Sequence, residues 1–557
     1  MKGFKYLLLL LQVVVSGFAF ANSYSSINYK LTPVFSQKTS FIKVEVSLKG
    51  NMDGKVGIDF PYEWADSEYF SQIKNIKLDN PVGSITFKMD EINQAIISSP
   101  ATKKLNFSYE IHQKPTNART WREVIIRRDL IHSTGHGLFI TPSDMKDTDK
   151  VQINIAWENI PQEWKTLSDH GIGKSMNFIG TEQDLLHTIY VAGNIRIYKL
   201  PNVNNPVYLS VYGNFDELKD NIVVADLSKI IRSQRAFFND QDFPFYAISL
   251  IEGTDPYSGG GTALNKSFVV YFHRSIDRFV PCILFAHEHL HTWIGGKIRN
   301  NEQKERLNYW WTEGFTEYYT RILALRSGLI SMEDFINECN KFLRNYYLSS
   351  VLNEPNTRIE KDFWKNEDVE KLPYNRGFVF AIYLNNMIKK HNPKNSLDNV
   401  MLDLLKTSKQ TSFSIGHFKN IAKTYIPEGI NTEISMFIDK GDTINLNNLI
   451  SIIPIEKVRM GTYERGFDLD AFRDKKIIKN IVKNSNAYKA GLRDGDKIIE
   501  FNFPKGGDPD QIAIIKTKNQ TFKFRPENAD KRIIYQIKSN LTMHDKKQIK
   551  DFFGASE

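Results

Sequence analysis

The chain has 557 residues, of which 41% are hydrophobic, 25% charged and 12% aromatic. This composition excludes collagen-like, mucin-like and intrinsically disordered proteins, because enough apolar side chains are present for several hydrophobic cores. Lysine and arginine number 73, and aspartate and glutamate 64, which gives a net charge of +9 without a long block of one sign. Such a distribution argues against a nucleic-acid-binding arm. Two cysteines, Cys282 and Cys339, could form one bridge but no disulfide framework, and we expect buried thiols.

The first 21 residues have the pattern of a signal peptide. Lys2 and Lys5 precede an apolar run, and Ala-Phe-Ala over 19–21 is the small-x-small sequence that a signal peptidase cleaves. The run is short for an uncleaved membrane anchor, which is the alternative, and no later segment is long enough to span a bilayer. We therefore expect export to the periplasm or the extracellular space, and no transmembrane segment in a mature chain that begins at Asn22.

Residues 22–212 predict a β-rich domain, because apolar residues alternate at period two and clusters of turn-forming residues separate the runs. Helical spacing then begins near residue 222, and residues 213–448 predict an α+β unit that is mainly helical. Two strands are expected in this unit, at 246–251 and 267–272. The predicted helices cover 226–238, 279–293, 308–326, 331–346, 374–390, 398–406 and 415–424.

Residues 449–545 return to short strands. Within them, 486–500 combines a small residue, Ala-Gly-Leu and Gly-Asp-x-Ile, which is a tight turn that leads into a strand. That run resembles PDZ domains, and the resemblance implies a candidate site for a carboxyl-terminal peptide or an added strand. Residues 546–557 are expected to be a C-terminal tail. The predicted fold class is therefore multidomain, with a β-rich domain, an α+β mainly helical domain and a PDZ-like β domain.

The segment Phe-Ala-His-Glu-His-Leu-His-Thr-Trp over 285–293 carries the pattern of a metal site. On a helix, His287 and His291 are four residues apart and share one face, within reach of one ion. Glu288 lies beside the open coordination position, where a carboxylate can accept a proton from water. His289 lies on another face and is not expected to bind the metal. The alternative, histidines that only pack or cap, is disfavoured by the apolar run that carries the motif into a buried helix.

The predicted helix over 308–326 supplies the remaining metal ligand. Zinc hydrolases hold the metal with three protein ligands and leave one position open, and Glu313 is the natural third ligand. Glu317 lies four residues further along the same helix face. From this position the Glu317 carboxylate can hold the outer nitrogen of His287 or His291. The alternative is that Glu317 is only a surface charge. The expected cofactor is one Zn²⁺ per chain.

Together these motifs resemble the gluzincin metallopeptidases, and within them they are most similar to the glycyl aminopeptidase family. The distinctive marks are His-Thr-Trp over 291–293 and Trp-Thr-Glu-Gly-Phe-Thr-Glu-Tyr-Tyr over 311–319. The resemblance implies a thermolysin-like catalytic domain between an N-terminal β domain and a C-terminal PDZ domain. It also implies that His287, His291 and Glu313 are zinc ligands and that Glu288 is the general base.

A tyrosine in the segment Leu-Pro-Tyr-Asn-Arg-Gly-Phe over 372–378 matches a further family feature. In related enzymes a tyrosine before a basic residue and a glycine stabilises the tetrahedral intermediate, and Tyr374 holds that position. A phenol can donate to a developing oxyanion without adding charge in the ground state. We expect the segment to open a helix, and the alternative role for Tyr374 is to cap the start of that helix.

The glycine-rich segment before residue 267 departs from the family. Related enzymes carry a Gly-Gly-x-Glu-His strand whose glutamate binds the free amine of the substrate, and Ala263 stands at the glutamate position here. The edge strand can still hold a peptide backbone by strand addition, and three glycines are the candidate substrate-binding residues: Gly259, Gly260 and Gly261.

We therefore predict an exported zinc metallopeptidase that acts on peptides or proteins and has no nucleic-acid partner. A zinc-activated water and Glu288 would carry the reaction. Because Ala263 lacks a carboxylate, cleavage within peptides is favoured over a strict aminopeptidase with a relocated amine anchor, such as Glu252 or Asp255. A third alternative, a non-catalytic scaffold or peptide-binding protein with a PDZ domain, is disfavoured by the intact ligands, base and tyrosine.

Overall fold

The chain forms two compact units, which meet in sequence at Asn194 and Ile195. The predicted signal peptide lies outside the described residues, and export therefore stays a prediction. Among the described residues, no helix combines the length and the apolar character needed to cross a membrane. The computed structural model describes residues 24–36, 39–60, 63–64, 67–79, 83–87, 94–113, 124–145, 148–241, 245–254, 259–299, 304–468, 472, 475–504 and 509–555.

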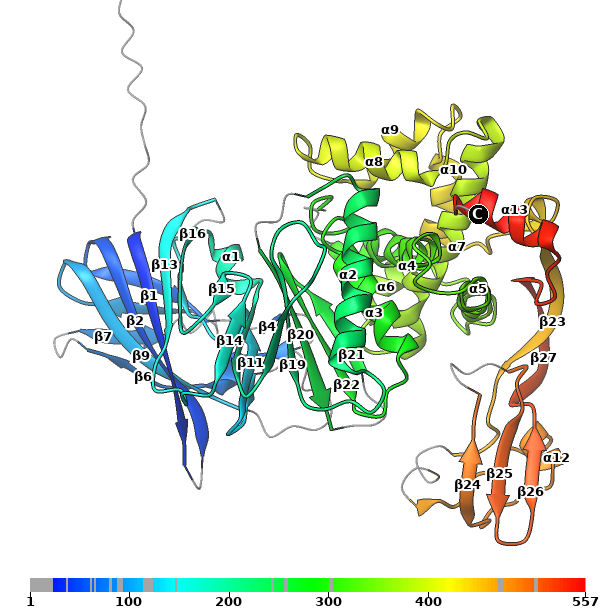
Figure 1. The fold of residues 1–557 in the computed structure, drawn as a ribbon, viewed down its shortest axis with the longest axis horizontal. Coiled ribbons are helices and arrows are strands. Elements are labelled where there is room, and N and C mark those ends of the chain that lie inside the picture. The colour runs from blue at the N-terminus through cyan, green and yellow to red at the C-terminus, as the bar shows by residue number, and fades with distance from the viewer. Residues whose placement is uncertain are drawn as a thin grey trace, which may run out of the picture. The chain divides into compact units, whose positions relative to one another are not determined.

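The first unit is β-rich, as the sequence predicts, and Figure 1 draws it in blue to cyan. Its largest sheet has the strand order β16-β13-β1-β2-β9-β6, and one core joins it to the sheets β12-β3-β8-β7 and β10-β11-β17-β14-β15. The strand bounds are β1 Tyr24–Phe35, β2 Ser40–Met52, β3 Lys55–Asp59, β6 Ile73–Leu78, β7 Ser84–Phe87, β8 Gln94–Ser98, β9 Thr102–His112, β10 Ile125–Ile126, β11 Leu130–Thr134, β12 Thr141–Pro142, β13 Val151–Trp157, β14 Lys165–Ser168, β15 Gly171–Ile172, β16 Ser175–Gly180 and β17 Ile189–Gly193.

Alternation along β2 shows why these residues form strands. Ile42, Val44 and Val46 are buried in the core, whereas the side chains of Lys43 and Glu45 between them are about half exposed. One face of the strand therefore contributes to the core and the other faces solvent. Among the described residues of this unit, the one α-helix is the short α1 (Glu182–Leu186).

The second unit begins with a five-stranded sheet of order β18-β19-β20-β22-β21. Its three central strands are mutually parallel, and β18 and β21 are antiparallel edge strands. The predicted domain boundary at residue 212 was wrong, because β18 and β19 precede it yet belong to the sheet of the second unit, where β18 pairs with β19 and β19 with β20. Periodicity identifies a strand but not its partner. The bounds are β18 Arg196–Lys199, β19 Val207–Tyr212, β20 Tyr246–Gly253, β21 Gly259–Ala263 and β22 Ser267–His273.

Helices follow the sheet at nearly the predicted positions, and one large core joins them to it. In Figure 1 they run from green to yellow. Helix α3 packs against β21 and β22, and α4 packs against α3 and α7. The helix bounds are α2 Asp220–Phe237, α3 Phe279–Leu290, α4 Tyr309–Arg326, α5 Met332–Tyr347, α6 Thr357–Asp362, α7 Glu367–His391, α8 Leu397–Ser408, α9 Ile415–Lys423 and α10 Asn431–Glu433.

The C-terminal region contains a two-stranded ribbon and a separate small sheet. Strands β23 (Ile455–Tyr463) and β27 (Glu527–Ile537) pair with each other and contribute side chains to the large core. The sheet of β24 (Ile498–Asn502), β25 (Ala513–Thr517) and β26 (Thr521–Phe524) has its own core with helix α12 (Asn486–Lys489). As predicted, a tight turn leads from 486 into β24: Gly491 and Gly495 adopt φ of +107° and +93°.

The expected tail at 546–557 is largely helical. Helix α13 (Met543–Phe553) buries Phe552 and Phe553 in the large core. Their backbone carbonyls accept hydrogen bonds from Asn385 Nδ2 at 3.2 Å and Arg326 Nε at 2.7 Å, respectively. The predicted tail is therefore wrong: residues up to Phe553 belong to the body of the second unit. Two adjacent phenylalanines on a short helix need a core partner, and α4 and α7 supply it.

Candidate metal centre and active site

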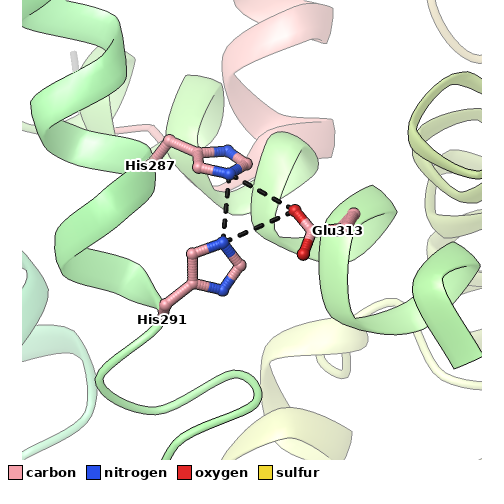
Figure 2. A group of neighbouring side chains, drawn as sticks. All are labelled: His287, His291 and Glu313. Atoms are coloured by element: carbon pink, nitrogen blue, oxygen red, sulfur yellow. Dashed lines mark hydrogen bonds and ion pairs between the residues drawn. The ribbon is translucent and has the colours of Figure 1, made fainter. Parts of the chain in front are cut away.

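Three side chains from α3 and α4 converge on one point, as Figure 2 shows. His287 lies on the last turn of α3, His291 follows as its C-terminal cap, and Glu313 lies on the second turn of α4. The Nε2 atoms of the two histidines are 3.1 Å apart. Oε2 of Glu313 lies 3.4 Å from Nε2 of His287 and 3.5 Å from Nε2 of His291. Among the described residues, this is the single group found that could hold a metal ion.

The size of this triangle fits zinc. A tetrahedral zinc ion with ligand distances of about 2.0–2.2 Å places its ligand atoms about 3.3–3.6 Å from one another. The observed separations of 3.1, 3.4 and 3.5 Å are close to that range. Two imidazole nitrogens and one carboxylate oxygen also form a donor set that zinc prefers in hydrolases.

Both imidazoles are held by their outer nitrogens, which leaves Nε2 directed at the centre. Nδ1 of His291 lies 3.1 Å from the carbonyl oxygen of Ile294, which can only accept a hydrogen bond. Nδ1 of His287 lies 3.5 Å from Oε2 of Glu317. A proton on Nδ1 leaves Nε2 with a free electron pair, as a metal ligand requires.

The turn after α3 explains how the Ile294 carbonyl reaches His291. Gly295 has a φ of +93°, and a Cβ on Gly296 would lie 2.5 Å from the carbonyl oxygens of His291 and Thr292. The chain can therefore fold back tightly only with glycine at these two positions. A backbone acceptor of this kind leaves no side-chain signal for sequence analysis to find.

Glu313 is half-buried beside the two imidazoles. Burial raises the pKa of its carboxyl, but the charges and hydrogen bonds of His291 and His287 outweigh that effect, and the pKa falls below its ordinary value. The carboxyl is therefore ionised, which is the state that binds a metal.

Glu288 is 6% exposed and lies against the edge strand β21. A Cβ built on Gly261 would be 2.5 Å from Oε1 of Glu288, closer than any real contact. Because Gly261 has no side chain, the Glu288 carboxylate fits between α3 and β21. The structure thus brings the predicted base beside the predicted glycine strand.

Tyr374 lies on α7, with its hydroxyl protonated. Burial, followed by the negative charges of Glu313 and Glu288, raises the pKa of Tyr374 well above its ordinary value. A protonated hydroxyl in this environment can donate a hydrogen bond.

The expectation that Tyr374 opens a helix was wrong. Helix α7 begins at Glu367, and the side chain of Asn366 accepts hydrogen bonds from the backbone N–H groups of Asp368 and Val369. This asparagine cap starts the helix two turns earlier, with Pro373 tolerated inside it. Tyr374 therefore caps no helix start, and the alternative role is excluded.

Two glycines set the distance between the helices that carry Glu313 and Tyr374. Gly314 on α4 and Gly377 on α7 face each other, and a Cβ on either would overlap the backbone of the other helix. Arg376 beside this contact is buried and donates to the carbonyls of Leu352 and Glu354 at 3.0 and 2.6 Å. The arginine and glycine that follow Tyr374 thus make backbone contacts that hold α7 in place beside α4, the helix that carries Glu313.

His289 points away from the centre, as predicted. Its Nδ1 lies 2.6 Å from Oε1 of Gln234, whose amide donates to the carbonyl of Ala286 at 2.8 Å. Burial lowers the pKa of His289 well below its ordinary value, so the ring is neutral. It contributes to the packing of α2 on α3.

The candidate substrate strand β21 lies at the edge of its sheet, and only β22 pairs with it among the described residues. Gly261 and Ala263 are two residues apart and project to the same face, the face on which Glu288 lies. Of the alternative amine anchors, Glu252 accepts a hydrogen bond at 2.7 Å from the backbone N–H of Asn214. Asp255 lies outside the described residues.

Comparisons with known proteins agree with this geometry. Residues 282–358 match the family model of the M61 glycyl aminopeptidases, a span that contains all three candidate ligands and Glu288. A search of curated proteins gives no match. A solved aminopeptidase N family protein from Idiomarina loihiensis superposes with a TM-score of 0.70 at 14% identity, covering 95% of this chain and 100% of its own. That likeness shows the multidomain fold.

Two structures of yeast LTA4 hydrolase are also similar. The bestatin complex has a TM-score of 0.47 and 15% identity over 76% of this chain and 68% of its own. The native enzyme has a TM-score of 0.48 and 15% identity over 76% and 69%. The family match over residues 282–358 agrees with the resemblance of the sequence motifs, and together they support a zinc metallopeptidase similar to the M61 glycyl aminopeptidases.

Proposed function

We propose that the chain hydrolyses peptide bonds with one zinc ion held by His287, His291 and Glu313. The observation that carries the proposal is the triangle of three donor atoms, with sides of 3.1, 3.4 and 3.5 Å, next to a buried glutamate at a strand edge. Zinc at such a site polarises the carbonyl of the substrate and lowers the pKa of water. The remaining steps belong to the protein's own side chains.

Glu288 is the proposed general base. Its carboxylate accepts a proton from the attacking water and passes that proton to the nitrogen of the leaving amine, which balances the hydrolysis. Support comes from its burial at 6% exposure and from its place beside β21, where the scissile bond would lie if the substrate adds to the strand edge. Because Glu288 is not a ligand, its loss is expected to stop catalysis while the metal stays bound.

Tyr374 is the proposed donor to the carbonyl oxygen. As that oxygen gains negative charge in the transition state, a neutral phenol can stabilise it, and a raised pKa keeps the proton on the tyrosine. Support comes from the charge effects of Glu313 and Glu288 on this hydroxyl and from the glycine contact that holds α7 against α4.

We also propose that a free amino terminus is not required. The family name points to release of an amino-terminal residue, which needs a carboxylate to hold the α-amine in a water-poor cleft. Here Ala263 projects to the substrate face of β21, and Glu252 is engaged by the backbone of Asn214. Cleavage within peptides is therefore favoured, and a strict aminopeptidase with another anchor is the second candidate.

The C-terminal sheet β24-β25-β26 is the proposed PDZ-like module, for a carboxyl-terminal peptide or an added strand. Its support is the turn of 486–500 and the edge position of β24, where Ile499 is 70% exposed. Fluorescence titration with labelled carboxyl-terminal peptides tests this. Binding that is unaffected by blocking the peptide carboxylate and by Ile499→Glu would contradict it.

Two variants and the wild-type protein test the catalytic proposal together. The wild-type protein should bind about one zinc per chain by metal analysis, and His291→Ala should lose it. Glu288→Gln should retain zinc but lose most hydrolysis of a mixed peptide substrate, by roughly 10²–10⁴-fold. Unchanged zinc in His291→Ala would contradict the ligand assignment, and near-normal turnover in Glu288→Gln would remove this residue from the mechanism.

A further inference from the structure

A largely buried series of charged side chains leads from the metal centre to helix α5. Oε2 of Glu317, which lies 3.5 Å from Nδ1 of His287, also accepts a hydrogen bond from Nη1 of Arg321, one turn further along α4. Nη2 of the same guanidinium donates to Oε2 of Glu338 on α5 at 2.9 Å. A proposed metal ligand is thus linked through Glu317 and Arg321 to a neighbouring helix.

Arg321 is held from three sides. It is only 4% exposed, and its guanidinium lies 4.6 Å from the centre of the Phe342 ring in addition to its two carboxylate partners. A buried guanidinium is costly unless its donors are paired, so these contacts restrict it to one orientation. Its planar fork can bond two carboxylates at once, which the single ammonium of a lysine cannot do with the same geometry.

We infer that Arg321 is a positioning residue of the metal centre, which acts on His287 by holding the carboxylate of Glu317 in place. The inference rests on the proposed zinc site. Groups that hold the outer nitrogen of a metal-binding histidine typically account for 10–100-fold in metal affinity. Glu317 has three rotatable side-chain bonds, and Arg321 fixes them by binding the same oxygen that faces the imidazole.

Glu338 completes the arrangement from α5. It gives the guanidinium a second partner. The position of Arg321 is therefore fixed by α5 as well as by Glu317 on its own helix. Helix α5 thereby influences the metal centre although Glu338 touches no proposed ligand. Lys341 offers a matched control, because its ammonium lies 3.7 Å from Glu338 but its side chain is 42% exposed and screened by water.

The test measures zinc affinity by competition with a chelator, on variants whose fold is verified by circular dichroism. Arg321→Met should weaken zinc binding by roughly 10–100-fold. Because this change leaves Glu338 buried without its partner, Arg321→Met with Glu338→Met removes the pair together and should show the same loss. Lys341→Met should keep the wild-type zinc affinity.

A double-mutant cycle with Glu317→Gln separates positioning from a general structural effect. If Arg321 acts through Glu317, Arg321→Met adds little further loss of zinc affinity once Glu317 is already glutamine. Additive losses, or wild-type zinc affinity in Arg321→Met, would overturn the inference. A wild-type chain that binds no zinc at all would instead contradict the proposed function on which it rests.

Discussion

Adding one methyl group at Gly261 should displace the proposed general base. The Cβ of an alanine there would lie 2.5 Å from Oε1 of Glu288 and 2.8 Å from its Cγ and Cδ. Ordinary contacts begin at 3.4 Å, so the carboxylate and the strand must separate by about 0.9 Å. Since Glu288 is buried between α3 and β21, the carboxylate cannot make this movement without a change in the direction in which its oxygens point.

A displacement of that size has a large kinetic effect. Misplacing a catalytic group by about 1 Å can lower the rate by roughly 10²-fold, which corresponds to about 2.7 kcal/mol of transition-state stabilisation. We therefore expect Gly261→Ala to lower kcat/KM by roughly 10²-fold. Zinc content should stay at the wild-type value, because the three proposed ligands lie on α3 and α4.

The assay compares kcat/KM on one peptide substrate with zinc content and melting temperature. Gly416→Ala is the matched control: it makes the same chemical change at an exposed helical position, where the new Cβ would lie 3.6 Å from Ser414 Oγ, an ordinary contact. If Gly261→Ala keeps the kcat/KM of the wild type, the close approach of strand and base is not what positions Glu288. Loss of zinc in this variant would equally refute the reasoning, because the effect would then lie at the metal.

Two further predictions concern the oxyanion and the amino terminus. Tyr374→Phe should lower kcat by roughly 10²–10³-fold with little change in KM, measured by steady-state kinetics, and a rise in KM alone would make Tyr374 a binding residue. Peptides that differ only in amino-terminal acetylation should be cleaved at comparable rates, and Ala263→Glu should shift preference toward the free amine by roughly 10–100-fold. If acetylation abolishes cleavage by the wild type, another residue binds the amine, and a strict aminopeptidase becomes the favoured function.

Much of the candidate site could be predicted from the sequence because its signals are local. A spacing of four on a helix places His287 and His291 on one face, whatever surrounds that helix. The apolar run before them predicted a buried helix, and α3 is one. Period-two alternation predicted the strands of the first unit for the same reason: the pattern depends on the backbone repeat alone.

Tertiary partners could not be predicted in the same way. Strands β18 and β19 had the expected pattern, but they belong to the sheet of the second unit through the pairing of β19 with β20, which moves the domain boundary to Asn194. Likewise, the sequence predicted that Glu317 lies beside His287 or His291. Only the packing of α4 on α3 shows that the neighbour is His287. Nothing in the local sequence states which helix faces which.

The contacts that sharpen the site come from segments far apart in the chain. Gly261 leaves space for Glu288, and Gly377 leaves space for the backbone of α4. Arg321 joins Glu317 to a carboxylate on α5. A glycine in a sequence shows that a side chain is missing, but the group that occupies the space is known only once two elements meet. The sequence by itself therefore determined which residues are candidates for the chemistry, and the tertiary structure decided what contacts each of them, because close packing is a property of neighbours in space.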